Sequence, residues 1–142
     1  MQQAEASIAF RILPQPHLCR SVREGVAEFA RAGGVGPDVL EQFQTALGEA
    51  LANAIEHGRC RSEIGVDIRL SHDRIVATVR DCGVGFVAQP GDERLPDVSS
   101  ERGRGFPIMR ECSDIFTIQS VPGHGTVVVI GRYLPLADED VA

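Results

Sequence analysis

Alternating apolar and polar residues, together with β-forming residues, predict five β-strands. They are expected at residues 6–13, 63–70, 74–80, 114–121 and 126–133. Apolar residues at helical spacing predict a first helix over 17–32 and a second that opens at Pro37 and ends near Gly58, and a short helix is expected over 106–111. This order of elements predicts an α+β fold. We expect a two-layer α/β sandwich with helices on one face of a mostly antiparallel sheet.

The second helix carries a polar stripe beside its apolar face. Glu49, Asn53 and Glu56 fall together on that stripe, so a carboxylate and a carboxamide one turn apart can act on a shared ligand. Gly48 comes directly before Glu49, although a glycine inside a helix costs about 1 kcal/mol against alanine. That cost predicts that some group needs close access at this point of the helix.

The segment from Asp81 to Gly105 has no sustained periodicity and is rich in glycine, proline and charged residues. A loop of this length within a compact domain is uncommon unless it is a functional lid or is disordered. We therefore expect a lid over residues 87–102. The rest of the chain shows no linker or repeat, so residues 1–142 are expected to form one domain, with frayed tails at 1–5 and 135–142.

Composition narrows the classes of function. The net charge is −6, which argues against direct nucleic-acid binding because phosphate contacts need a basic surface. All 14 basic residues are arginine, which excludes mechanisms that need a lysine. The four cysteines form no CxxC pair, so free thiols are expected rather than a metal or disulfide framework. Without a secretion signal or membrane-spanning apolar run, a cytoplasmic location is expected.

Four short features in series carry the candidate chemistry. They are Glu49-xxx-Asn53, Asp81-Cys-Gly83-Val-Gly85, Gly103-Arg-Gly105 before a helix, and Gly125-Thr126. Singly, each has a simpler interpretation: a solvated helix surface, a glycine turn, or a strand entry. Together they suit a nucleotide site. Glycines before a helix let backbone N–H groups approach phosphates, an asparagine oxygen can complete an Mg²⁺ shell, and Asp81 can accept a hydrogen bond from an exocyclic amine. Glu49 can orient or deprotonate an attacking hydroxyl.

These motifs resemble a known family. GEALANAIEHG (48–58), VRDCGVGF (79–86) and ERGRGFPIMRECSD (101–114) are the most specific segments. Their order resembles the Bergerat-type ATPase fold shared by DNA gyrase, a class of heat-shock chaperones, MutL proteins and sensor histidine kinases. Within that group the chain most resembles the small bacterial anti-sigma-factor serine/threonine kinases. The resemblance runs from the first strand to Tyr133.

The resemblance implies a role for each matching residue. Glu49 matches the catalytic base, Asn53 the Mg²⁺ ligand and Asp81 the aspartate that recognises the adenine amine. Either Arg102 or Arg104 matches the arginine that reaches the terminal phosphate. The other implied nucleotide-binding positions are His57, Gly83, Gly85, Gly103, Gly105, Phe106 and Thr126. For the side chain of Phe106, packing in the core is the simpler interpretation.

The resemblance also implies a function. The chain is expected to bind ATP and Mg²⁺, to phosphorylate a STAS-domain anti-anti-sigma protein and to hold a sigma factor by partner switching, with a homodimer possible. One alternative is a switch kinase that acts on a STAS scaffold without binding a sigma factor. Another is a nucleotide-binding interaction module without transfer activity. The ATPase portion of a histidine kinase is disfavoured, because no helix pair with a phospho-accepting histidine precedes the first strand.

Overall fold

A computed structural model describes residues 5–57, 63–81, 105–121 and 124–135 of the chain. The predicted strands and helices are present there, with their ends displaced by one residue at most. In chain order they are β1 (Ala6–Ile12), α1 (Pro16–Ala32), α2 (Pro37–His57), β2 (Ile64–Leu70), β3 (Arg74–Asp81), α3 (Gly105–Glu111), β4 (Ile115–Val121) and β5 (Gly125–Tyr133). None of the helices among these residues is long and apolar enough to cross a membrane.

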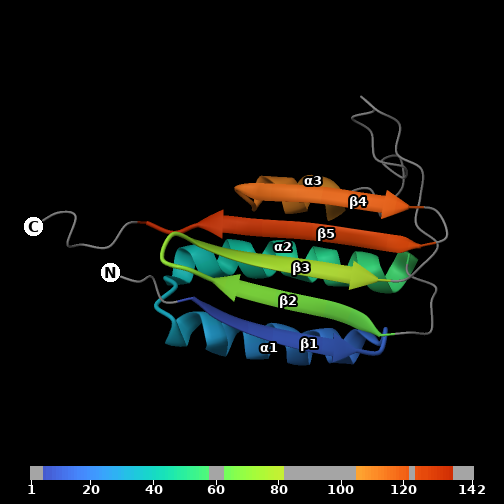
Figure 1. Cartoon of the computed structure of the whole chain (residues 1–142), viewed down its shortest axis with the longest axis horizontal. Helices are drawn as coiled ribbons and strands as arrows, with labels where there is room; N and C mark the ends of the chain where they lie inside the picture. The colour runs from blue at the N-terminus through green and yellow to red at the C-terminus, as the bar shows by residue number, and fades with distance from the viewer. Residues whose placement is uncertain (1–4, 58–62, 82–104, 122–123, 136–142) are drawn as a thin grey trace, which may run out of the picture.

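The five strands form one sheet in the order β1-β2-β3-β5-β4, and every neighbouring pair is antiparallel. The last strand of the chain, β5, therefore lies between β3 and β4. All three helices lie behind the same face of the sheet (Figure 1). The predicted α+β sandwich with helices on one face is confirmed.

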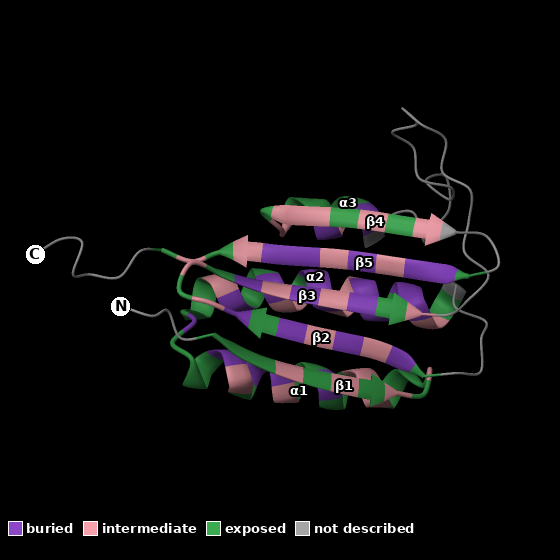
Figure 2. Ribbon diagram, viewed as in Figure 1, coloured by how far each residue is buried: buried purple, intermediate pink, exposed green. Residues whose placement is uncertain are grey.

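The core lies between this sheet face and the helices. Every second residue of β2 is buried, and β3 shows the same alternation (Figure 2). The matching face of α2 is apolar, and its fully buried side chains are Phe43, Ala46, Leu47, Ala50 and Leu51. Fully burying a side chain as large as leucine or phenylalanine contributes about 1.5–3 kcal/mol. Burial of this face therefore anchors α2 along the sheet and sets the position of its polar stripe.

A short turn joins β2 to β3 and helps to set their register. The backbone N–H of Ser71 donates to the carbonyl of Arg74 at 2.9 Å. The side chain of Arg74 donates to both carboxylate oxygens of Asp73, each at 3.1 Å, and the Ser71 hydroxyl donates to Asp73 at 3.0 Å. The hydrogen bonds from Arg74 and then from Ser71 lower the pKa of Asp73 to about 2. This turn lies at the end of β3 opposite to Asp81 (Figure 1).

Gly48 of α2 lies against the side chain of Arg23 from α1. A Cβ atom added at Gly48 would lie 3.5 Å from Cζ and 3.5 Å from Nε of Arg23, which is ordinary van der Waals contact. The group that was predicted to come close to this glycine is thus the flexible side chain of Arg23, from the neighbouring helix.

Replacing Gly48 with alanine is expected to stabilise the protein by up to about 1 kcal/mol. The added methyl group fits beside Arg23, and alanine has the higher helix propensity. Urea unfolding followed by circular dichroism measures this change. A loss of stability would mean that the α1–α2 contact does not tolerate the methyl group.

Candidate active site

Two of the predicted motifs meet at one end of the sheet. β3 ends at Asp81 and β5 begins at Gly125, and their register pairs Asp81 with Thr126. β4 and α2 also end at this side of the molecule (Figure 1). Because β5 runs directly beside β3, a residue 45 positions later in the chain comes next to the predicted adenine-recognising aspartate.

Asp81 and Thr126 both belong to the face of the sheet that the helices cover. Along β3, Asp81 shares its face with buried Ala77 and Val79, and along β5, Thr126 shares its face with buried Val128. Thr126 is only 6% exposed, whereas Asp81 is half-buried. By strand alternation the two residues therefore belong to the helix-covered face, at one end of the core.

The polar stripe of α2 ends near the same place. Asn53 is 9% exposed, and Glu49, one turn earlier, is half-buried. Asn53 is thus a largely buried carboxamide near the end of the stripe, where it can take part in a site for a polar ligand.

The donor set around Asn53 suits Mg²⁺ bound together with phosphate. Within the described parts of the chain, no group of three or more histidine, cysteine, aspartate or glutamate side chains could hold a metal ion. Mg²⁺ commonly takes only one or two protein oxygens and completes its shell with phosphates and water. The Asn53 oxygen fits that mode of binding, in which the nucleotide supplies further ligands.

The helix after the glycine motif packs on α2. α3 begins at Gly105, and its residues Phe106 and Met109 are buried in the core. Phe106 is 5% exposed, so packing is its clearest structural role. α3 is followed after a few residues by β4, which runs back toward Asp81 (Figure 1).

Several predicted site residues lie outside the described residues. They are Gly83, Gly85, Arg102, Gly103 and Arg104, together with the expected lid over 87–102. His57 is the last residue of α2. The roles predicted for these residues stay predictions.

Comparison with known proteins shows which family the chain belongs to. The profile of the histidine kinase-like ATPase domain matches residues 12–131. The chain is 31% identical over 120 residues to the anti-sigma F factor of Bacillus velezensis, covering 79% of this chain and 82% of that one. It is 31% identical over 138 residues to the anti-sigma F factor of Bacillus licheniformis, covering 92% of each. The chain belongs to the anti-sigma-factor branch of the histidine kinase-like ATPase family.

A solved structure shares the fold of this ATPase-family chain. The crystal structure of the RsbU and RsbW domains of a Mycobacterium tuberculosis protein superposes with a TM-score of 0.70 at 19% identity. The match covers 92% of this chain and 34% of that chain, so this chain spans about a third of the solved one. At this identity the likeness shows the fold alone.

Membership of this ATPase family makes ATP the expected ligand. One residue near the predicted adenine end of the site, Ser120, was missed by sequence reasoning. The hydroxyl of Ser120 in β4 lies 2.9 Å from the hydroxyl of Thr126. The register of β4 and β5 pairs these two residues directly. Counting outward between the last two predicted strands pairs Val121 with Thr126 and misses this pair by one position, because β5 begins at Gly125. The two strands were predicted, but their register was not.

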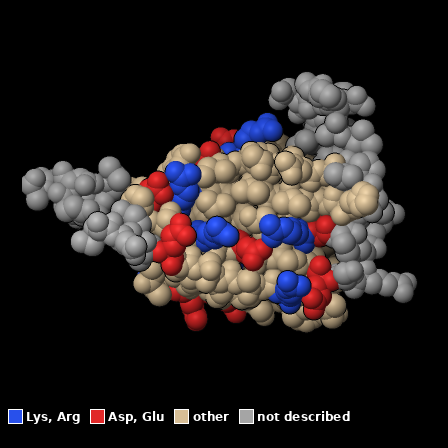
Figure 3. Space-filling view, in the orientation of Figure 1, with Lys and Arg blue, Asp and Glu red and all other residues tan. Residues whose placement is uncertain are grey.

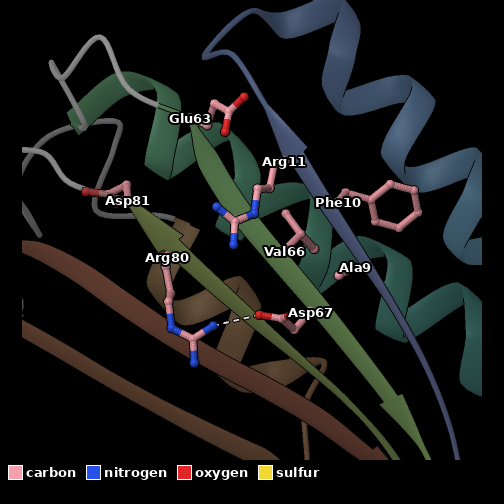
Figure 4. Close-up of a pocket in the computed structure, with 9 residues that line it drawn as sticks. Ala9, Phe10, Arg11, Glu63, Val66, Asp67, Arg80 and Asp81 are labelled. Carbon is pink, nitrogen blue, oxygen red and sulfur yellow. Dashed lines mark hydrogen bonds and ion pairs between the residues drawn. The ribbon is translucent and has the colours of Figure 1, made fainter.

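A hollow of about 290 Å³ lies elsewhere on this ATPase-family domain (Figure 4). Its lining includes Arg11, Gly65, Asp67 and Arg80, which alternate with the buried residues of their strands and so belong to the opposite face of the sheet. Of the predicted site residues that the structure describes, only Asp81 lines it.

This hollow carries both signs of charge. Arg80 and Asp67 form an ion pair at 2.6 Å across it, and Glu63 and Arg11 also line it. Acidic and basic side chains follow one another across this face, beside a broad uncharged band (Figure 3). The mixed charge does not favour a triphosphate, so the helix-covered end of the sheet remains the candidate site.

Proposed function

We propose that this chain is an ATP- and Mg²⁺-dependent serine/threonine kinase that acts as an anti-sigma factor in the cytoplasm. Its substrate is a STAS-domain anti-anti-sigma protein, and it holds a sigma factor by partner switching. The observation that carries the proposal is the pairing of Asp81 with Thr126 at the end of the sheet where α2 also ends, with Asn53 largely buried on that helix. The anti-sigma F factor relatives support the choice of partners.

In the proposed binding mode, each described residue contacts one part of the nucleotide. The Asp81 carboxylate accepts a hydrogen bond from the exocyclic amine of adenine, and Thr126 lies beside it. The Asn53 oxygen would hold Mg²⁺, which would supply neutralisation of the phosphate charge. The roles predicted for Gly103 and Gly105 at the phosphates, and for Arg102 or Arg104 at the terminal phosphate, belong to the same binding mode.

Glu49 performs the proton transfer of the reaction. Its carboxylate lies one turn of α2 before Asn53, so it is on the phosphate side of the site rather than the adenine side. It accepts the proton of the attacking serine or threonine hydroxyl as that oxygen forms its bond to the terminal phosphorus and ADP departs. The protein contributes mainly positioning and charge stabilisation to this step.

A transfer assay tests the proposal. The STAS-domain proteins of the same genome are incubated one at a time with this chain, Mg²⁺ and ATP labelled on its terminal phosphate. We expect label on a serine or threonine of at least one of them, and loss of sigma-factor binding when that protein is present unphosphorylated. ATP binding with no transfer to any of them would favour the non-catalytic interaction module. Transfer without any sigma-factor binding would favour the switch kinase.

A further inference from the structure

The hydroxyl pair between Ser120 and Thr126 lies at the adenine end of the proposed site. The two oxygens are 2.9 Å apart, and either can be the donor. Thr126 is 6% exposed and pairs in register with Asp81 on its other side, so it lies between Asp81 of β3 and Ser120 of β4. Ser120 lies on the same strand face as Ile118 and Phe116, which pack against the core. All three polar side chains thus belong to the helix-covered face.

The direction of this hydrogen bond decides what Thr126 can offer a ligand. A threonine hydroxyl has one hydrogen to donate and lone pairs that accept. If Thr126 donates to Ser120, it presents only an acceptor to the site. If Ser120 donates to Thr126, the single Thr126 hydrogen is left to point toward the ligand. The direction of the Ser120–Thr126 hydrogen bond therefore sets whether Thr126 can offer a donor to a ligand.

The edge of the purine distinguishes these two cases. Adenine presents an amine donor next to the N1 acceptor, whereas guanine presents the O6 acceptor next to an N1–H donor. The ionised Asp81 carboxylate is acceptor-only, so it matches the adenine amine. The neighbouring group must then be a donor to match adenine N1, and an acceptor there would suit guanine instead.

We propose that Ser120 is a positioning residue for adenine recognition: it donates to Thr126 and so directs the Thr126 hydrogen to purine N1. This inference rests on the proposed function and names a residue of its binding site. A serine–threonine pair across two strands also stabilises a hairpin. The test therefore needs a readout that depends on N1 alone.

Calorimetry with ATP and 1-deaza-ATP, which lacks the N1 acceptor, supplies that readout. Wild-type protein is expected to bind 1-deaza-ATP about three- to tenfold more weakly than ATP, the range for one neutral hydrogen bond. Ser120→Ala leaves the Thr126 hydrogen in place without the bond that orients it, so it is expected to reduce this ratio toward one by weakening ATP binding only. Ser120→Thr, which keeps the hydroxyl, is expected to retain the ratio. Thr117 is an exposed residue of the same strand, so Thr117→Ala is the matched control and is expected to leave both nucleotide affinities unchanged.

The outcomes separate this inference from the proposed function. An unchanged ratio in Ser120→Ala, or equal weakening of both nucleotides, overturns the role of Ser120 and leaves the ATP site standing. A wild-type protein that binds ATP without distinguishing 1-deaza-ATP also overturns it. A wild-type protein that binds neither nucleotide overturns the proposed function as well. If Ser120→Ala does not fold, Thr126→Val must show the same collapse of the ratio, and its absence counts against the inference.

Discussion

Glu49→Gln is expected to abolish phosphoryl transfer while ATP binding stays within about threefold of wild type. General-base catalysis typically contributes about 10²–10⁴-fold to a rate, and glutamine keeps the shape of glutamate without its ability to take a proton. Glu49 is half-buried on α2, one turn from Asn53, so its proposed place is beside the reacting phosphate rather than at the adenine. Single-turnover transfer of labelled phosphate, with binding measured separately by calorimetry, distinguishes the two effects.

The matched control for this variant is Glu41→Gln. Glu41 lies on the same helix, is exposed and stands two turns before Glu49, so it is expected to keep wild-type activity. If Glu49→Gln transferred phosphate at the wild-type rate, the assignment of the base would be wrong. Equal loss of activity in both variants would point to a general effect of the helix charge.

Asn53→Ala is expected to make the nucleotide-free protein more stable and to remove the Mg²⁺ dependence of ATP binding. Alanine has the higher helix propensity, so a gain of up to about 0.7 kcal/mol is expected. Loss of the metal-binding oxygen removes the contribution that Mg²⁺ makes to affinity. A binding site commonly carries such a cost in stability.

Thermal unfolding with and without Mg²⁺ and ATP measures both effects in one experiment. Wild-type protein is expected to gain stability when ATP and Mg²⁺ are added together, because a ligand that binds only the folded state stabilises it. Asn53→Ala is expected to start from a higher melting temperature and to gain less. A variant that melts lower than wild type, yet keeps the full response to Mg²⁺, would show that Asn53 is a structural residue.

Most of the fold could be predicted because each element carries its own local signal. The buried alternation of β2 and β3 and the apolar face of α2 are visible in the sequence, and the structure confirms them. The neighbours of each strand were harder to foresee. Nothing local indicates that β5 inserts between β3 and β4, although that insertion is what brings Thr126 beside Asp81.

The same distinction applies to individual residues. Glu49 and Asn53 could be singled out because their spacing along one helix is a local property. Ser120 and the contact of Arg23 with Gly48 depend on which elements pack together, so the sequence pattern alone did not reveal them. Gly48 shows the difference: the cost of this glycine to helix stability could be predicted from the sequence, but its contact with Arg23 could not.

Calorimetric titration of ATP and Mg²⁺ into wild-type protein and Asp81→Asn tests the central claim most directly. The claim is that an adenine nucleotide binds at the end of the sheet where Asp81 pairs with Thr126. We predict saturable binding to the wild type and about tenfold weaker binding to Asp81→Asn, because a charge-assisted hydrogen bond to the adenine amine becomes a neutral one. No binding to the wild type at millimolar ATP, or equal affinity in both proteins, would contradict the claim.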